Sequence, residues 1–156
     1  MITVLFVCLG NICRSPMAEA IFDALVAKEG LSDQFHIDSV GTSSYHIGEP
    51  AHRGTRQVLA AHGLQSKSRA RQITTVDLNQ ADYIIAMDRS NFSDLKYVMR
   101  GHSPKGQTGL LLQFADHSPT LDVPDPYYTG NFEHVYRLVE DGCRGLLAHI
   151  RQEQEI

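Results

Sequence analysis

The chain has 156 residues, a formal net charge of −4 at pH 7 and three cysteines. Its length predicts one domain, residues 1–156, with a sizeable core. The mild charge gives no reason to expect nucleic acid or an anionic membrane as a partner. No apolar stretch approaches the roughly 20 residues that cross a bilayer. Because the cysteines show no secreted spacing pattern, we expect a cytoplasmic protein.

Short apolar segments alternate with segments of helical periodicity along the chain. Strands are expected at about residues 2–8, 35–40, 82–87 and 109–113. Helices are expected from Ser15 to near Gly30, at about 55–62 and 89–100, and from the capping residue Asn131 to Ile150. This alternation predicts an α/β fold in which helices cover both faces of a parallel sheet.

The most informative segment is the loop between the first strand and the first helix, residues 8–15. Its unpaired backbone N–H groups are expected to converge and bind a tetrahedral oxyanion. Cys8 supplies a nucleophile whose thiolate form such a loop favours, and Arg14 can bind two phosphate oxygens at once. Ser15 is expected as the N-cap, with a hydroxyl that can also donate to the thiolate, and Pro16 as the first helical residue. The loop predicts cleavage of a phosphate monoester through a cysteine.

A plainer interpretation makes Cys8 a buried core residue at a strand end and Arg14 a surface charge. Taken singly, most cysteines and arginines are of that kind. The strand, the glycine-bearing loop, the Arg-Ser-Pro sequence and the helix occur here together, and that context favours the catalytic interpretation.

With this loop in view, the chain resembles the low-molecular-weight protein tyrosine phosphatases. The matching segments are residues 7–16, 39–42, 70–72, 86–88 and 123–127, spread over almost the whole chain in the family's order. The resemblance implies a three-layer αβα sandwich with a four-stranded parallel sheet in the flavodoxin-like order 2-1-3-4. That order puts the loop at the switch point of the sheet, where ligands bind.

The resemblance also implies hydrolysis of phosphotyrosine through a Cys8 thiophosphate. The phosphate would be bound by Arg14 and by the loop N–H groups of Leu9, Gly10, Asn11, Ile12, Cys13, Arg14 and Ser15.

The departing phenoxide needs a proton, and Asp125 is the expected general acid and base. It lies between two prolines, which restrict its backbone, and a phosphate dianion nearby would favour its protonated form. By itself, an Asp-Pro pair is more often a turn. Asp122 is the nearest competitor, and the resemblance favours Asp125.

The resemblance assigns the support of the loop to Asn11, Ser15 and Ser39. Asn11 is expected in a left-handed conformation, tethered by both serines. At Ser68 many relatives have a histidine that shares in this tether, so the loop is expected to be held differently here.

Aromatic walls around the phosphorylated ring are implied at Tyr45, Tyr127 and Tyr128, although a tyrosine pair alone is more often a loop anchor. A deep pocket would favour phosphotyrosine over phosphoserine. Ile12 resembles the tyrosine-specific group, since relatives that act on phosphoarginine tend to have threonine there. The segment 51–55 lacks the family's usual helix start and leaves the outer wall undefined.

Cys13 suggests a redox function. Four residues separate it from Cys8, so an oxidised Cys8 could be captured as a Cys8–Cys13 disulfide before irreversible oxidation. The alternative is a small loop residue without redox function. No metal or cofactor is expected, because Cys143 lies on the apolar stripe of the last helix and no second ligand pair is present.

Three other functions compete with tyrosine phosphatase: a protein arginine phosphatase, an arsenate reductase and a non-catalytic phosphate-binding module. An arsenate reductase relays oxidation through a further cysteine pair, whereas only Cys143 follows the loop here. A binding module would lack the nucleophile or the acid. The expected partner is a tyrosine-phosphorylated protein, with a tyrosine kinase among the candidates, and the chain is expected to act as a monomer.

Overall fold

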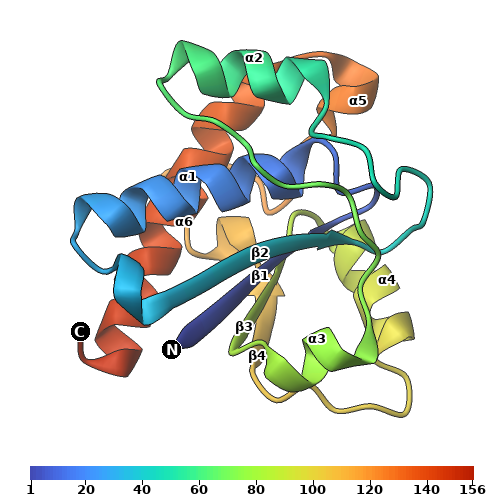
Figure 1. Cartoon of the computed structure of the whole chain (residues 1–156), viewed down its shortest axis with the longest axis vertical. Helices are drawn as coiled ribbons and strands as arrows, with labels where there is room; N and C mark the ends of the chain where they lie inside the picture. The colour runs from blue at the N-terminus through green and yellow to red at the C-terminus, as the bar shows by residue number, and fades with distance from the viewer.

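A computed structural model describes all 156 residues. Its centre is a four-stranded sheet in the order β2-β1-β3-β4 (Figure 1). All neighbouring strands are parallel. The strands are β1 (Ile2–Cys8), β2 (Phe35–Gly41), β3 (Tyr83–Ala86) and β4 (Gln107–Leu110). The predicted flavodoxin-like order is confirmed.

Both faces of the central strand are buried. In β1, Val4 and Phe6 belong to the larger apolar core, whereas Leu5 and Val7 belong to the smaller one. Successive side chains of a strand point to opposite faces, so an apolar run without alternation is typical of a strand covered on both sides.

Helices form a layer on each face of the sheet, as Figure 1 shows. The larger core lies beneath α1 (Arg14–Lys28), α2 (Arg53–Ala61) and α6 (Phe132–Gln154), and the smaller lies beneath α3 (Thr75–Gln80) and α4 (Arg89–Val98). One further short helix, α5 (Pro126–Thr129), and two 3₁₀ turns, Ser32–Gln34 and Leu111–Gln113, complete the chain. The predicted αβα sandwich is confirmed. None of the helices has the length and apolar character that a bilayer span requires.

The prediction for the last strand was wrong at its carboxyl end. Residues 109–113 continue an apolar run, but β4 ends at Leu110 and a 3₁₀ turn follows. The side chain of Gln113 accepts a hydrogen bond from the Leu110 amide, and Leu111 packs over Gly142 of α6. A short apolar run does not distinguish a strand from a buried turn.

The first helix begins earlier than predicted. Its first residue is Arg14, so Ser15 and Pro16 are the second and third helical residues rather than the N-cap and the first. A proline costs nothing there, since the first-turn amides have no intrahelical acceptor. Ser15 is therefore free for contacts other than capping.

Two short helices were not predicted. The first, α3, starts with a reciprocal capping box between Thr74 and Asp77. The second, α5, starts after Asp125, whose carboxylate accepts from the Tyr127 amide, and has Pro126 at its first position. Both starts have recognisable sequence signals, a Thr-x-x-Asp pattern and an Asp-Pro pair.

Candidate active site

The loop after β1 lies at the carboxyl edge of the sheet. Cys8 is the last residue of β1 and pairs in register with Gly41 of β2, so the loop emerges between β2 and β3. Cys8 is 3% exposed, and Arg14, which opens α1, is 2% exposed. The sulfur and the guanidinium are thus fixed by a strand end and a helix start rather than by a mobile loop.

Asn11 holds the loop from behind. Its backbone has a φ of 57°, in the left-handed region that asparagine tolerates. Its amide group donates to the Ser15 hydroxyl at 2.8 Å and to the Ser39 hydroxyl at 3.0 Å, and its carbonyl oxygen accepts from the Arg71 amide at 3.0 Å. Because Asn11 uses both amide protons, each serine keeps its own hydroxyl proton for another acceptor.

The two serines lie toward opposite ends of one chain of contacts. Ser15 Oγ lies 3.0 Å from Cys8 Sγ, whereas Ser39 Oγ donates to Glu19 Oε1 at 2.6 Å. The network therefore runs from the sulfur of Cys8 to a carboxyl on α1, and Glu19 was not predicted from the sequence. Burial raises the pKa of Glu19 to about 7.

Ser68 does not take part in this tether. Its hydroxyl lies 3.3 Å from the hydroxyl of Ser66. The tether in this chain ends instead at Glu19.

Arg14 is surrounded by acceptors. One of its guanidinium nitrogens, Nη1, donates to Asp88 Oδ2 at 2.5 Å and to the Val123 carbonyl at 2.9 Å, and Nη2 lies 3.4 Å from Asp125 Oδ2. Burial opposes the charge of Arg14, but Cys8 and the two carboxylates outweigh it and raise the pKa of the guanidinium. Arg14 therefore stays charged at the bottom of the pocket.

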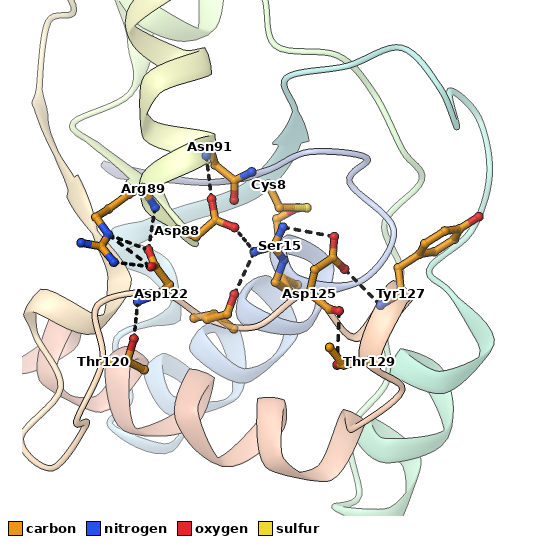
Figure 2. A network of polar contacts seen from close by, with 12 residues as sticks. Cys8, Ser15, Asp88, Arg89, Asn91, Thr120, Asp122, Asp125, Tyr127 and Thr129 are labelled. Atoms are coloured by element: carbon orange, nitrogen blue, oxygen red, sulfur yellow. Dashed lines mark hydrogen bonds and ion pairs between the residues drawn. The ribbon is translucent and has the colours of Figure 1, made fainter.

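Asp88 is a second residue that sequence reasoning did not assign. It follows β3 and caps α4 by accepting from the Asn91 amide, while its other oxygen binds Arg14. Figure 2 shows Asp88, Asp125 and the Cys8 sulfur gathered in one small region, with Tyr127 farther out. A carboxylate directly after a buried parallel strand was the available signal, since strand carboxyl ends meet at the ligand edge.

The structure brings Asp125, not Asp122, to the pocket. Asp125 is both a turn residue and a neighbour of the site, because Oδ1 accepts from the Tyr127 amide and Oδ2 faces Arg14. Asp122 forms an ion pair with Arg89 at 2.7 Å on the surface, and that partner lowers its pKa (Figure 2).

The pocket above Cys8 has a volume of about 270 Å³. Asn11, Ser15 and Ser39 lie behind the pocket rather than in its lining. The lining includes the four predicted wall residues and one histidine that sequence reasoning missed: Ile12, Tyr45, Tyr127, Tyr128 and His46. Its base includes Cys8, Leu9, Gly10, Cys13 and Arg14.

The segment 51–55 forms the outer support of the loop. The His52 amide donates to the Ile12 carbonyl at 2.7 Å, and the Thr55 hydroxyl donates to the Cys13 carbonyl at 3.1 Å. His52 also caps α2 by accepting from the Gly54 amide. Its ring stacks on Phe132. A histidine cap replaces the usual helix start, which the sequence pattern had left undefined.

All three cysteines are free thiols. Cys13 lines the pocket, and burial, with help from Asp125 and Cys8, raises its pKa to about 12. Cys143 is fully buried in α6, which raises its pKa as well. No group of three or more His, Cys, Asp or Glu side chains is placed to hold a metal ion.

A sheet edge at which one loop holds a buried cysteine and a buried arginine is that of a cysteine-dependent phosphatase. The family model described as "Low molecular weight phosphotyrosine protein phosphatase" matches residues 3–156. The chain is 50% identical to "Low molecular weight protein-tyrosine-phosphatase YfkJ" of Bacillus subtilis over the full length of both proteins. The chain belongs to the low molecular weight protein tyrosine phosphatase family.

Solved structures agree with this assignment. The crystal structure of YfkJ from Bacillus subtilis matches with a TM-score of 0.93 and 49% identity, over 98% of this chain and 96% of that one. A Drosophila arginine phosphatase matches with a TM-score of 0.89 and 36% identity, over 95% of this chain and 97% of that one. The same backbone thus carries proteins named for two different phosphorylated residues.

Proposed function

We propose that the protein hydrolyses phosphotyrosine in proteins in two steps, with Cys8 as the nucleophile. In the first step, Cys8 Sγ attacks phosphorus in line, the bond between phosphorus and the phenol oxygen breaks, and Asp125 gives its proton to that oxygen. Arg14 and the loop N–H groups stabilise the charge on the equatorial oxygens. The single observation that carries this proposal is the convergence of Arg14 and Asp125 above the buried Cys8 sulfur.

In the second step, Asp125 accepts a proton from water as the water oxygen attacks the thiophosphate. The bond between phosphorus and sulfur breaks, and inorganic phosphate leaves. The Ser15 hydroxyl, 3.0 Å from the sulfur, donates to the departing thiolate. Asp88 acts through Arg14 by orienting its guanidinium.

Ile12 and the tyrosine walls support phosphotyrosine over phosphoarginine. Ile12 presents an apolar surface in the pocket, and Tyr127 and Tyr128 offer edges and faces to a planar ring. Phosphoarginine instead carries a polar guanidinium group that an apolar wall leaves unpaired. Because the chain is also similar to an arginine phosphatase, phosphotyrosine and phosphoarginine must be compared directly as substrates.

The test is phosphate release from matched peptides that carry phosphotyrosine, phosphoserine or phosphoarginine, measured without added metal for the unaltered protein and for Cys8→Ser. We expect turnover of the phosphotyrosine peptide and its loss in the variant. Preference for phosphoarginine would keep the mechanism and overturn the specificity. No turnover of any peptide would favour a phosphate-binding module.

The substrates are phosphoproteins, and we propose a tyrosine kinase as the first partner class to test. We propose that the protein acts as a monomer, because one copy of the chain already brings Cys8, Arg14 and Asp125 to one pocket and the proposed reaction needs no residue of a partner. A reduced Cys8 is needed for attack, and this requirement supports a cytoplasmic location.

We also propose a reversible redox state of the loop. A peroxide would oxidise Cys8 to a sulfenic acid, and the Cys13 thiol would condense with it to form the Cys8–Cys13 disulfide and release water. The high pKa of Cys13 supports Cys8, rather than Cys13, as the thiol that the peroxide oxidises. After peroxide and then dithiothreitol, activity should return in the unaltered protein and not in Cys13→Ser. Equal recovery in both would exclude the disulfide.

A further inference from the structure

A second cleft lies beside the phosphate pocket and has no function in the proposed mechanism. It has a volume of about 360 Å³ and runs between the loop after β2 and the helix α4, which Figure 1 shows on the same side of the molecule. Leu9 and Tyr45 line both cavities, so the cleft continues directly from the pocket.

The floor of the cleft is tied to the catalytic loop. The Thr42 amide donates to the Cys8 carbonyl at 2.9 Å, and the Ser43 amide and hydroxyl both donate to the Leu9 carbonyl. On the other side, the Gln72 side chain donates to the Thr42 carbonyl at 3.1 Å. A group held on this floor would therefore keep a fixed position relative to the Cys8 sulfur.

The floor also contains a hydroxyl group without a hydrogen-bond partner. The Thr42 hydroxyl is buried and has no hydrogen-bond partner within the protein. Buried polar groups are nearly always paired, and an unpaired one calls for a water or ligand partner. Thr42 is one of the residues that line this cleft, and its hydroxyl can both donate and accept.

The outer wall carries a negative charge and an exposed ring. Asp94 is the only charged residue in the lining; it is half-buried and forms no ion pair or hydrogen bond with another side chain. Tyr97 is 75% exposed. A partly desolvated carboxylate beside an aromatic face suits a cation, and Leu9 offers apolar surface for the carbon stem of such a side chain.

We propose that this cleft is a substrate subsite that takes a lysine or arginine side chain within about three residues of the phosphotyrosine. Asp94 would pair with the cation, Tyr97 would cover it, and the polar floor would bind the peptide backbone. The two cavities share Leu9 and Tyr45, and an extended peptide advances about 3.3 Å per residue, so a residue close in sequence to the phosphotyrosine can reach the cleft. The inference rests on the proposed hydrolysis of phosphotyrosine and adds a preference for basic sequence on one side of it.

The test is a set of phosphotyrosine peptides with alanine at the six flanking positions, in which lysine or glutamate is placed at one position at a time. We expect lysine at one or two adjacent positions to raise kcat/KM by a factor of about 5 over alanine, and glutamate there to lower it. The ratio of kcat/KM for the lysine peptide to kcat/KM for the alanine peptide should fall close to one in Asp94→Asn. In Tyr97→Ala it should fall to a value between one and that of the unaltered protein.

Asp116→Asn is the matched control, because it makes the same change of charge at an exposed residue outside both cavities. It should keep the lysine preference, and all three variants should hydrolyse phenyl phosphate, which has no flanking residues, as the unaltered protein does. A lysine-to-alanine ratio near one at every position, or a ratio unchanged in Asp94→Asn, would overturn the subsite.

Separate measurements test the subsite and the proposed function. Hydrolysis of the all-alanine peptide tests the function, and the lysine-to-alanine ratio tests the subsite. If no peptide is hydrolysed, the affinity of the same peptides for Cys8→Ser, measured by calorimetry, tests the subsite. Tighter binding of the lysine peptide that Asp94→Asn abolishes would support it, and equal binding would overturn it.

Discussion

The floor and the walls of the phosphate pocket differ in how firmly they are held. Cys8 and Arg14 on the floor, and Asn11 behind it, are at most 3% exposed and are joined to their neighbours by hydrogen bonds. On the walls, Tyr127 is 51% exposed and Tyr128 is 76% exposed. Groups that carry out a reaction must be preorganised, whereas groups that select among substrates can be mobile. We therefore expect substitutions on the floor to lower kcat strongly, and substitutions on the walls to change mainly KM.

The largest effect is expected at the sulfur of Cys8. Cys8→Ser should lower kcat for an aryl phosphate by at least about a thousandfold, because a serine hydroxyl is a far weaker nucleophile than a thiolate. Cys13→Ser and Cys143→Ser are the controls, and both should retain most activity under reducing conditions. Loss of activity in Cys13→Ser equal to that in Cys8→Ser would contradict a single nucleophile.

The next effect concerns Asp125. Asp125→Asn should slow phenyl phosphate by about a hundredfold to a thousandfold, since general acid catalysis contributes on that scale. The loss should be much smaller for an aryl phosphate with an activated leaving group, which departs without a proton. Asp122→Asn is the matched control and should change neither rate. Equal losses on both substrates would remove Asp125 as the acid.

Asn11 tests the support of the floor. Asn11→Ala removes the contacts to Ser15, Ser39 and Arg71 and places alanine at a φ of 57°. We expect the free energy of unfolding to fall by about 2–4 kcal/mol and kcat to fall with it. Asn131→Ala, at a helix start without a side-chain cap bond, should cost much less. Chemical denaturation would measure both variants, and similar losses would show that Asn11 has no special function.

The walls should respond differently. Tyr127→Ala should raise KM for a phosphotyrosine peptide a few-fold with a small change in kcat, because aromatic pairs contribute about 0.5–1.5 kcal/mol. Tyr128→Ala should do less, since its ring is more exposed. Steady-state kinetics would separate the two constants. A fall in kcat in either tyrosine variant as large as that in a floor variant would contradict the difference between floor and walls.

The smallest effect concerns Glu19 and pH. Its pKa is raised from 4.5 to about 7 by burial, so the folded state holds this proton more tightly than the unfolded state. The contribution of Glu19 to stability is therefore full below pH 4.5 and is lost as the pH rises to about 7. Relative to the unaltered protein, Glu19→Gln should gain about 2 kcal/mol of unfolding free energy between pH 5 and pH 7.5.

Asp33→Asn, at an exposed residue that does not contribute to the raised pKa of Glu19, is the control and should show no such gain. Unfolding in urea at the two pH values would measure the difference. A gain for Asp33→Asn equal to that for Glu19→Gln would assign the effect to net charge rather than to the buried contact with Ser39.

The sequence predicted the sheet and the floor better than their supports. The loop from Cys8 to Ser15 has a local motif, and the strands have apolar runs, so both can be recognised from neighbouring residues. Glu19 and Asp88 reach the site from other elements, 20 and 74 residues from their partners Ser39 and Arg14. Such contacts depend on how the helices pack on the sheet. The end of a buried strand could mark Asp88 as a candidate, but no local pattern shows that it binds Arg14 or that Glu19 binds Ser39.

The central claim is that the phosphoryl group passes through Cys8, and a rapid-quench experiment tests it most directly. The protein would be mixed with an activated aryl phosphate and stopped in acid within the first turnovers, and the modified peptide would be identified by mass spectrometry. We expect one phosphoryl group on Cys8 and none on Cys13 or Cys143. Continued turnover with no phosphoryl group on the protein, or with one on another residue, would contradict it.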